Sequence, residues 1–200
     1  MLFATGNALW AFEWPDAGAP AAEIADFYRD ASGRIVIGGS MSLLAIAAFV
    51  LFAAAIRRLL VEAEGDDLLA TTAFGGAVLG MAAGVGAETT NLVGALRARD
   101  GQLSDALAQS LWEIARVLGS TAGGVGLGVF ALATAAVALR TGEVLPRWLA
   151  TVLAVIGLLL LTPISYLGEA TGGSMVVLAL IIGVVFLRKP VPNHSRSQPK

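Results

Sequence analysis

Five long apolar stretches, nearly free of charged residues, restrict the fold of this sequence more than any other feature. A helix crosses the hydrocarbon core of a bilayer with about 20 predominantly apolar residues, and each stretch approaches or exceeds that length. The sequence therefore predicts an all-α integral membrane protein, a bundle of five transmembrane helices. We place the spans at about residues 35–56, 68–88, 111–139, 148–168 and 170–187.

Composition supports a membrane protein and excludes several classes of function. Hydrophobic residues make up 56% of the chain, the mean hydropathy is +0.77, and charged residues make up 14%. Soluble domains average about 25% charged residues. The net charge of −2 argues against nucleic acid as a partner, and the absence of cysteine excludes disulfides and thiolate metal sites.

Residues 1–34 precede the first span and contain a short amphipathic pattern over Pro20–Gly33. Proline is well placed in the first turn of a helix, and glycine often follows the last turn. The apolar positions recur at helical spacing, and they are Ile24, Phe27, Tyr28 and Ala31. We expect a short N-terminal helix that lies on the membrane surface or against the other helices; the alternative is a lid over a site.

Glycines recur along the second and third spans at spacings that favour helix packing. Gly76, Gly80 and Gly84 are four residues apart and share one helix face, where small residues allow another backbone to approach. The expected packing residues are Gly76, Gly80, Gly84, Gly119, Gly123, Gly124 and Gly128. The run at 123–128 resembles a phosphate-binding loop, but it lies inside an apolar stretch and follows no strand, so helix packing is the interpretation.

Polar residues gather between the second and third spans. Glu88 and Asn91 continue the glycine face, Val93–Leu103 is expected to be a hydrophilic turn, and Ser104 to cap the next helix. Glu88 and Arg116 are then expected at the outer edge of the hydrocarbon. The candidate binding residues on this side of the membrane are Glu88, Asn91, Glu113, Arg116, Tyr166 and Glu169. A structural ion pair, ligand binding and catalysis are all compatible with them.

The residue types missing from the spans limit the possible chemistry. No span contains histidine or lysine, which excludes bis-histidine haem ligation and a retinal Schiff base within the membrane. A proton pump normally needs ionisable residues at several depths, and the spans lack them. We therefore expect no cofactor and no metal, and an enzyme is not favoured.

Basic residues near the span ends predict the orientation. Placing residues 57–58, 140–147 and 188–189 in the cytoplasm gives that side more arginine and lysine than the other. The N-terminus is then outside, the C-terminus is inside, and residues 190–200 form a polar cytoplasmic tail that we expect to be disordered.

Three short stretches together resemble a group of bacterial multi-pass membrane proteins known only as a domain of unknown function. They are Pro20–Arg34 (PAAEIADFYRDASGR), Arg57–Leu60 (RRLL) and Leu145–Ala150 (LPRWLA). The resemblance spans about Pro20–Lys189 and implies a five-helix bundle of the bacterial inner membrane. It implies no activity or catalytic residue.

Two functions remain open on the sequence. The first is a structural or interaction subunit, whose glycine faces pack in a homo-oligomer or against other membrane subunits, with membrane lipids around it. The second is the binding or transport of a lipid or amphiphile through an outward-facing polar vestibule.

Overall fold

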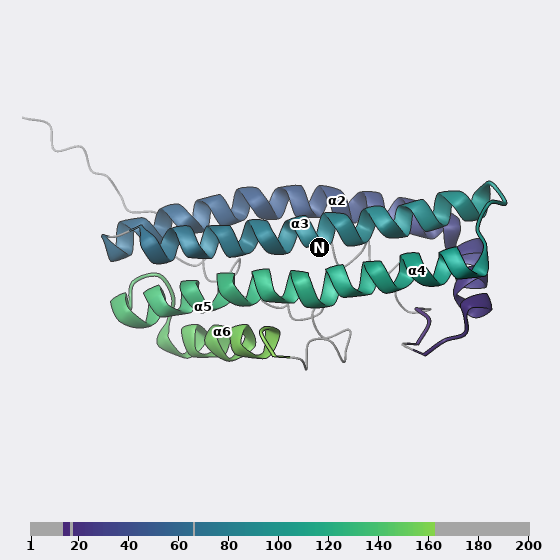
Figure 1. Cartoon of the computed structure of the whole chain (residues 1–200). Coiled ribbons are helices and arrows are strands. Elements are labelled where there is room, and N and C mark those ends of the chain that lie inside the picture. The colour runs from purple at the N-terminus through teal and green to yellow at the C-terminus, as the bar shows by residue number, and fades with distance from the viewer. Residues whose placement is uncertain (1–13, 17, 66, 163–200) are drawn as a thin grey trace, which may run out of the picture.

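A computed structural model describes residues 14–16, 18–65 and 67–162 of the chain. Regular structure in this part of the chain is helical, without strands. The helices are α2 (Ala21–Glu64), α3 (Leu68–Arg99), α4 (Asp105–Arg116), η2 (Val117–Ala122), α5 (Gly123–Thr141) and α6 (Arg147–Leu160). Figure 1 shows α2, α3 and the rod of α4 and α5 side by side, with α6 along α5. Helix α3 is central, because it contacts α2, α4 and α5.

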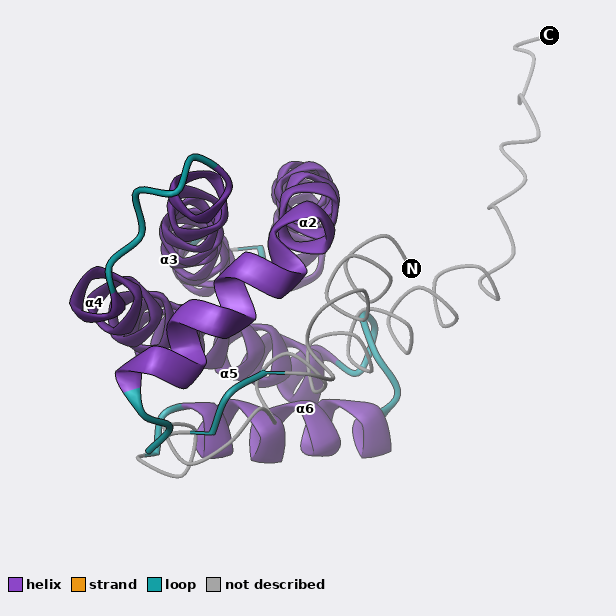
Figure 2. Cartoon of the chain, turned by 90° about the vertical axis from the view of Figure 1, so that its right-hand side faces the viewer, coloured by secondary structure: helices purple, strands orange, loops and turns teal. Residues whose placement is uncertain are grey.

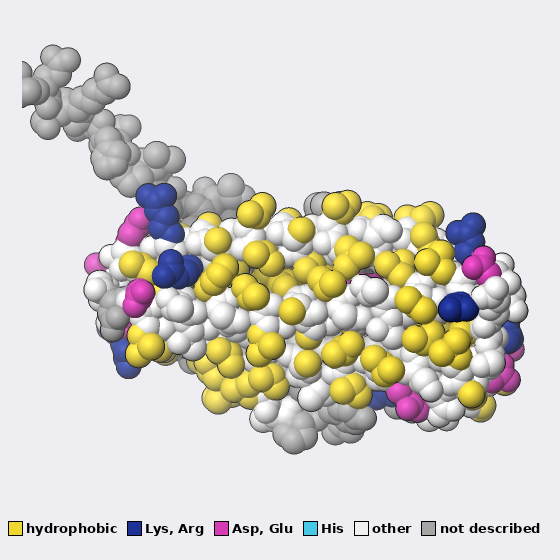
Figure 3. Space-filling view, turned by 45° about the horizontal axis from the view of Figure 1, so that its top comes forward, with side chains coloured by type: hydrophobic (Ala, Val, Ile, Leu, Met, Phe, Trp, Pro, Cys, Tyr) yellow, Lys and Arg dark blue, Asp and Glu magenta, His cyan; other side chains and the backbone are white. Residues whose placement is uncertain are grey.

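Within the described residues, three helices are long and apolar enough to cross a membrane: Ala21–Glu64, Leu68–Arg99 and Asp105–Thr141. Figure 3 shows most charged side chains of one face at the two ends of the molecule, with hydrophobic side chains between them. Large apolar side chains such as Leu44 and Leu51 on α2 are exposed, as is expected where lipid covers the surface.

The fourth and fifth predicted spans extend beyond the described residues. Helix α6 covers Arg147–Leu160, and it is a shorter apolar helix that lies within the predicted span at 148–168. The span at 170–187 and the tail at 190–200 lie outside the described residues. The number of five spans therefore stays a prediction.

Helix α2 joins two elements that the sequence analysis separates. The expected helix end at Gly33 is not observed, because the helix continues from Ala21 to Glu64. A glycine inside a helix costs only about 1 kcal/mol relative to alanine. The buried face that includes Tyr28, Ala31 and Ile35 continues across it. The separate amphipathic helix is thus corrected to the first turns of the first span's helix.

The first turns of α2 pass across the end of the bundle, near the ends of α3 and α4 (Figure 2). They pack there on an apolar group that we call the cap cluster. Its buried members are Ile24, Ala25, Tyr28, Ala31, Ile35, Ala95, Leu103, Ala108 and Trp112. The amphipathic pattern therefore reflects packing against the other helices.

Helix α3 is also longer than the sequence predicts. The hydrophilic turn expected at Val93–Leu103 is helical as far as Arg99, and the helix ends where Gly101 adopts a φ of 67°. The amide N–H of Gln102 donates to the carbonyl O of Arg97 at 2.9 Å and closes this end. Burial of Gly94 and Ala95 explains why the charged residues nearby do not end the helix earlier.

The third long helix contains a change of hydrogen-bond pattern. Ser104 caps it as predicted, because its hydroxyl accepts a hydrogen bond from the amide N–H of Leu107 at 3.3 Å. The helix then continues through α4, the π-helical segment η2 and α5 to Thr141.

Backbone contact between α3 and α5 forms what we call the glycine seam, made by Gly76, Gly80 and Gly126. A Cβ atom at Gly76 would lie 2.7 Å from the carbonyl O of Gly126, and one at Gly126 would overlap the backbone of Gly80. A Cβ atom at Gly80 would lie 3.2 Å from the carbonyl O of Gly123. Side chains other than hydrogen are therefore excluded from the centre of this crossing.

The other predicted packing glycines meet different neighbours. Gly84 faces Ile46 of α2, because each four-residue step along a helix turns the face by about 40°. Gly128 faces α6, where a Cβ atom would lie 3.0 Å from the carbonyl O of Gly157. Gly119 lies opposite Ala87 at an ordinary contact distance, and Gly124 is buried.

The glycine seam predicts a large effect of one methyl group. Gly126→Ala should lower the free energy of unfolding by about 2 kcal/mol or more, because the methyl group meets backbone atoms that cannot rotate away. The measurement is reversible unfolding in mixed micelles, followed by circular dichroism.

Gly75→Ala is the matched control. Gly75 neighbours the seam glycine Gly76, but it is exposed and has open space around it. It should be neutral or stabilise the protein by up to about 1 kcal/mol, since alanine favours the helix. Equal losses in both variants would contradict the close approach of α3 and α5.

Candidate functional site

Glu88 lies inside the bundle, between α3 and α2. The residue is 7% exposed. Its carboxyl group faces α2 at Gly39, where a Cβ atom would lie 3.4 Å from Oε2. The hydroxyl of the fully buried Ser42, also on α2, lies next to the carboxyl group. A carboxyl group and a hydroxyl group thus meet across an otherwise apolar helix pair.

Helix α3 continues into the hydrophilic turn that the sequence predicts, so Glu88 lies inside a helix and not beside its end. Because α3 continues to Arg99, about 13 Å of helix separates Glu88 from Arg97, the first charged residue that follows it. Ser42 is similarly far from Arg34 along α2. The carboxyl group therefore lies within the candidate span Leu68–Arg99, where an ionisable residue marks a functional site by default.

Two buried oxygen atoms at this place lack a hydrogen-bond partner among the described residues. They are Oε2 of Glu88 and Oγ of Ser42, and the Ser42 hydroxyl lies next to the Glu88 carboxyl group without a well-aligned hydrogen bond to it. An unsatisfied buried polar group costs about 1–3 kcal/mol, so such a pair requires an explanation.

Three other buried polar atoms without a partner in the described part of the chain are easier to explain. Oε2 of Glu64 belongs to a carboxylate whose other oxygen contacts Arg140 at 3.4 Å. The hydroxyl of Thr134 and the indole N–H of Trp112 are neutral groups. Glu88 differs from all three. It carries an ionisable carboxyl group inside a candidate span, and this group forms no ion pair with a described residue.

Asn91, one turn after Glu88, is held by Tyr28. The tyrosine hydroxyl donates to Oδ1 of Asn91 at 2.9 Å, and both residues are buried. A Cβ atom at Gly94 would lie 2.6 Å from the tyrosine ring, so this glycine makes room for it. The first turns of α2 thus supply the hydrogen-bond donor for the buried Asn91 amide on α3. We call Tyr28, Ser42, Glu88 and Asn91 the polar site.

The remaining predicted site residues have other surroundings. Glu113 is exposed on α4, and its carboxylate accepts a hydrogen bond from Gln109 at 3.0 Å. The guanidinium group of Arg116 lies 4.7 Å above the ring of Trp112. The structure therefore brings Glu88 and Asn91 together with α2 and leaves Glu113 on the surface. Tyr166 and Glu169 lie outside the described residues.

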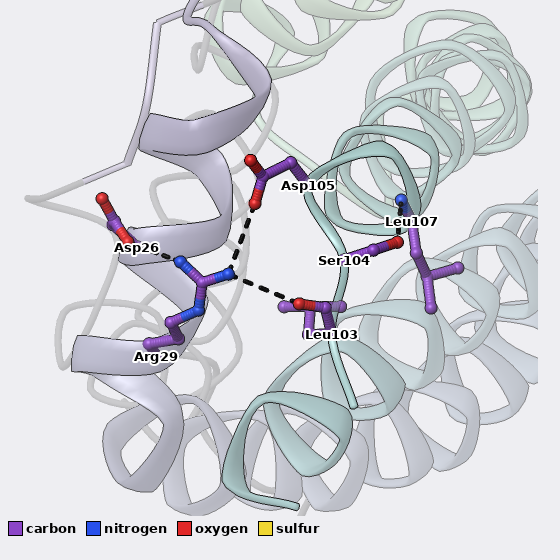
Figure 4. A network of polar contacts seen from close by, with 6 residues as sticks. All are labelled: Asp26, Arg29, Leu103, Ser104, Asp105 and Leu107. Carbon is purple, nitrogen blue, oxygen red and sulfur yellow. Dashed lines mark hydrogen bonds and ion pairs between the residues drawn. The ribbon is translucent and has the colours of Figure 1, made fainter. Parts of the chain in front are cut away.

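An exposed polar network fastens the first turns of α2 to the turn before α4 (Figure 4). The guanidinium group of Arg29 contacts Asp26 at 2.6 Å and Asp105 at 3.3 Å. It also donates to the carbonyl O of Leu103 at 3.4 Å. Exposed ion pairs contribute little energy, so the cap cluster beneath supplies most of the attachment.

Sequence reasoning missed Ser42, Gly39 and the role of Tyr28 in the polar site. Ser42 and Gly39 lie inside an apolar span, where the pair Gly38–Gly39 followed by two serines was the available signal. The described residues contain no group of three or more histidine, cysteine or acidic side chains placed to hold a metal ion. Comparisons with protein-family models, curated proteins and solved structures found no match to this chain.

The Tyr28–Asn91 bond can be tested with a double-mutant cycle. Tyr28→Phe should lower the free energy of unfolding by about 1–3 kcal/mol, because it leaves the buried Asn91 amide without its donor. The double variant with Asn91→Leu should lose less than the sum of the single losses. The measurement is unfolding in mixed micelles.

Arg29→Gln, on the exposed side of the same helix, is the control for this cycle. It should change stability by less than about 1 kcal/mol, because its ion pairs are exposed. Strict additivity of Tyr28→Phe and Asn91→Leu would contradict the bond.

Proposed function

We propose that this protein is a multi-pass membrane protein that binds a small ligand at the polar site between α2 and α3. The proposal keeps ligand binding at polar residues from the second function left open by the sequence, and it replaces the lipid and the outward-facing vestibule. The observation that carries it is the pair of buried oxygen atoms, Oε2 of Glu88 and Oγ of Ser42, that lack a partner among the described residues. A bound ligand would supply the missing interactions.

The shape of the site supports a small ligand rather than a lipid. The cap cluster covers this end of the bundle, and α2 approaches α3 closely enough at Gly39 for a Cβ atom to touch Leu92 at 3.2 Å. These contacts suit a small ligand better than an acyl chain. We therefore propose a site inside the bundle in place of the outward-facing vestibule.

The alternative, a structural or interaction subunit, loses its main argument. That hypothesis depended on glycine faces being free to pack against other subunits. Gly76, Gly80 and Gly126 instead contact one another within the chain, and Gly128 contacts α6. Packing inside the chain gives these residues a sufficient role.

The proposal keeps the five-span topology and the bacterial inner membrane inferred from the sequence. Among the described residues the basic side chains near the two ends are equally divided. One end has Arg29, Arg34, Arg97 and Arg99, and the other has Arg57, Arg58, Arg140 and Arg147. The proposed orientation, N-terminus out and C-terminus in, therefore depends on the basic residues at 188–189 and beyond.

Ligand binding at Glu88 predicts a stabilisation that depends on its carboxyl group. Protein in lipid nanodiscs is dialysed extensively and screened for thermal stability at several pH values and with inorganic ions, small polar molecules and lipids. A ligand at 100 times its Kd adds about 2.7 kcal/mol, or several degrees in Tm. At least one of the conditions or classes of compound in the screen should raise the Tm of the wild type and leave that of Glu88→Gln unchanged.

Glu113→Gln is the control, since it removes a carboxylate of the same type from the exposed surface of α4. It should respond to every added compound as the wild type does. The same response from wild type and Glu88→Gln across the whole screen would refute a ligand site at Glu88. A shift confined to lipids would favour the amphiphile.

The proposed orientation predicts opposite labelling of two loops. The chain has no cysteine, so Gln102→Cys and Glu143→Cys each introduce a single thiol into an exposed loop at opposite ends of the bundle. A membrane-impermeant maleimide added to intact cells should label Gln102→Cys, and Glu143→Cys only after lysis. The reverse pattern would place the N-terminus inside.

A further inference from the structure

We infer that the ligand of the polar site is a single monovalent cation, a proton or a sodium ion, held between Oε2 of Glu88 and Oγ of Ser42. This inference rests on the proposed function and names its ligand. It follows from the charge that is missing at the site, from the number of oxygen atoms available and from the space around them.

The buried carboxyl group of Glu88 determines the sign and the magnitude of the ligand's charge. Glu88 is a carboxyl group within a span, and burying an isolated carboxylate in an apolar medium is very costly. An anion would add to that cost. A divalent cation usually takes several carboxylates, and the described residues contain no such group. One positive charge balances the site.

Among the described residues, the charged and titratable groups around the site do not supply this charge. On α2 the facing residues are Gly39 and Ser42, which carry no charge. The Tyr28 hydroxyl is already bonded to Asn91. On α4, Arg116 lies over Trp112.

Two oxygen atoms without partners among the described residues match the needs of a small cation. A proton on Oε2 would allow Glu88 to donate to the Ser42 hydroxyl, which satisfies both atoms with one hydrogen. A sodium ion would use the same two oxygen atoms and require further oxygen ligands, such as water. Gly39 leaves the surface of α2 without a side chain beside Oε2, where the ion would lie.

Dicyclohexylcarbodiimide tests the inference on the full chain in nanodiscs. This apolar reagent adds to a protonated carboxyl group, and the adduct retains the whole reagent, so peptide mass spectrometry locates it. We expect one adduct on Glu88, formed more slowly as the pH rises, and no adduct at this position in Glu88→Gln. Sodium chloride is compared with choline chloride at equal ionic strength.

The two cations give different results. Slower labelling in sodium shows that sodium competes for the carboxylate, whereas a rate that depends on pH alone identifies the proton. Ser42→Ala keeps the carboxyl group but removes its neighbour. It should still be labelled, with weaker protection by sodium.

Infrared spectra of the same samples report the Glu88 carboxyl group whether or not the reagent reaches it. The band assigned by comparison with Glu88→Gln should change with pH or with sodium. If neither condition changes the adduct or this band, the inference is overturned. A Glu88-dependent stabilisation by an organic compound alone would retain the proposed function and refute the cation.

Discussion

The contact between the backbones of α3 and α5 is the constraint on which the rest of the structure depends. Gly76 and Gly80 meet Gly126 with no side chain between them. In a membrane, apolar side chains gain little by leaving lipid, so close backbone packing is one of the few ways to fix two helices together. With α3 held on this side, α2 packs along the neighbouring face of α3, which carries Glu88 and Asn91 further along the helix.

The polar site is a place where the bundle departs from the rules that stabilise it. Elsewhere in the described spans the buried residues are mostly alanine, glycine and larger apolar side chains. At Glu88 and Ser42 the structure retains buried polar atoms that lack partners among the described residues, at a cost in stability. Proteins tolerate such costs chiefly at functional sites, and Glu88 differs from Glu64 because it forms no ion pair with a described residue.

The sequence predicts the class of fold well because hydrophobic length is a local property. It predicts helix ends less well: Gly33 and Val93–Arg99 are helical because α2 and α3 bury each other's residues at the cap cluster. The sequence shows the four-residue spacing of the glycines on α3, but it does not show which helix packs against each glycine. Glu88 was recognised as a candidate, whereas Ser42 was not, since no local signal shows which residue of α2 faces it.

The π-helical segment η2 changes the rotation of α5 about the helix axis relative to α4 in the third long helix. Helix α4 directs Trp112 into the cap cluster, and α5 directs Gly126 to α3. A π turn holds more residues than an α turn, and one residue turns a helix by about 100°. Deleting one residue within Val117–Ala122, with a return to α-helical hydrogen bonding, would therefore keep Trp112 and Gly126 in phase, whereas a deletion within α4 or α5 would rotate Gly126 away from Gly80. The π turn holds the one residue that would otherwise put the contacts at the two ends of the bundle out of phase.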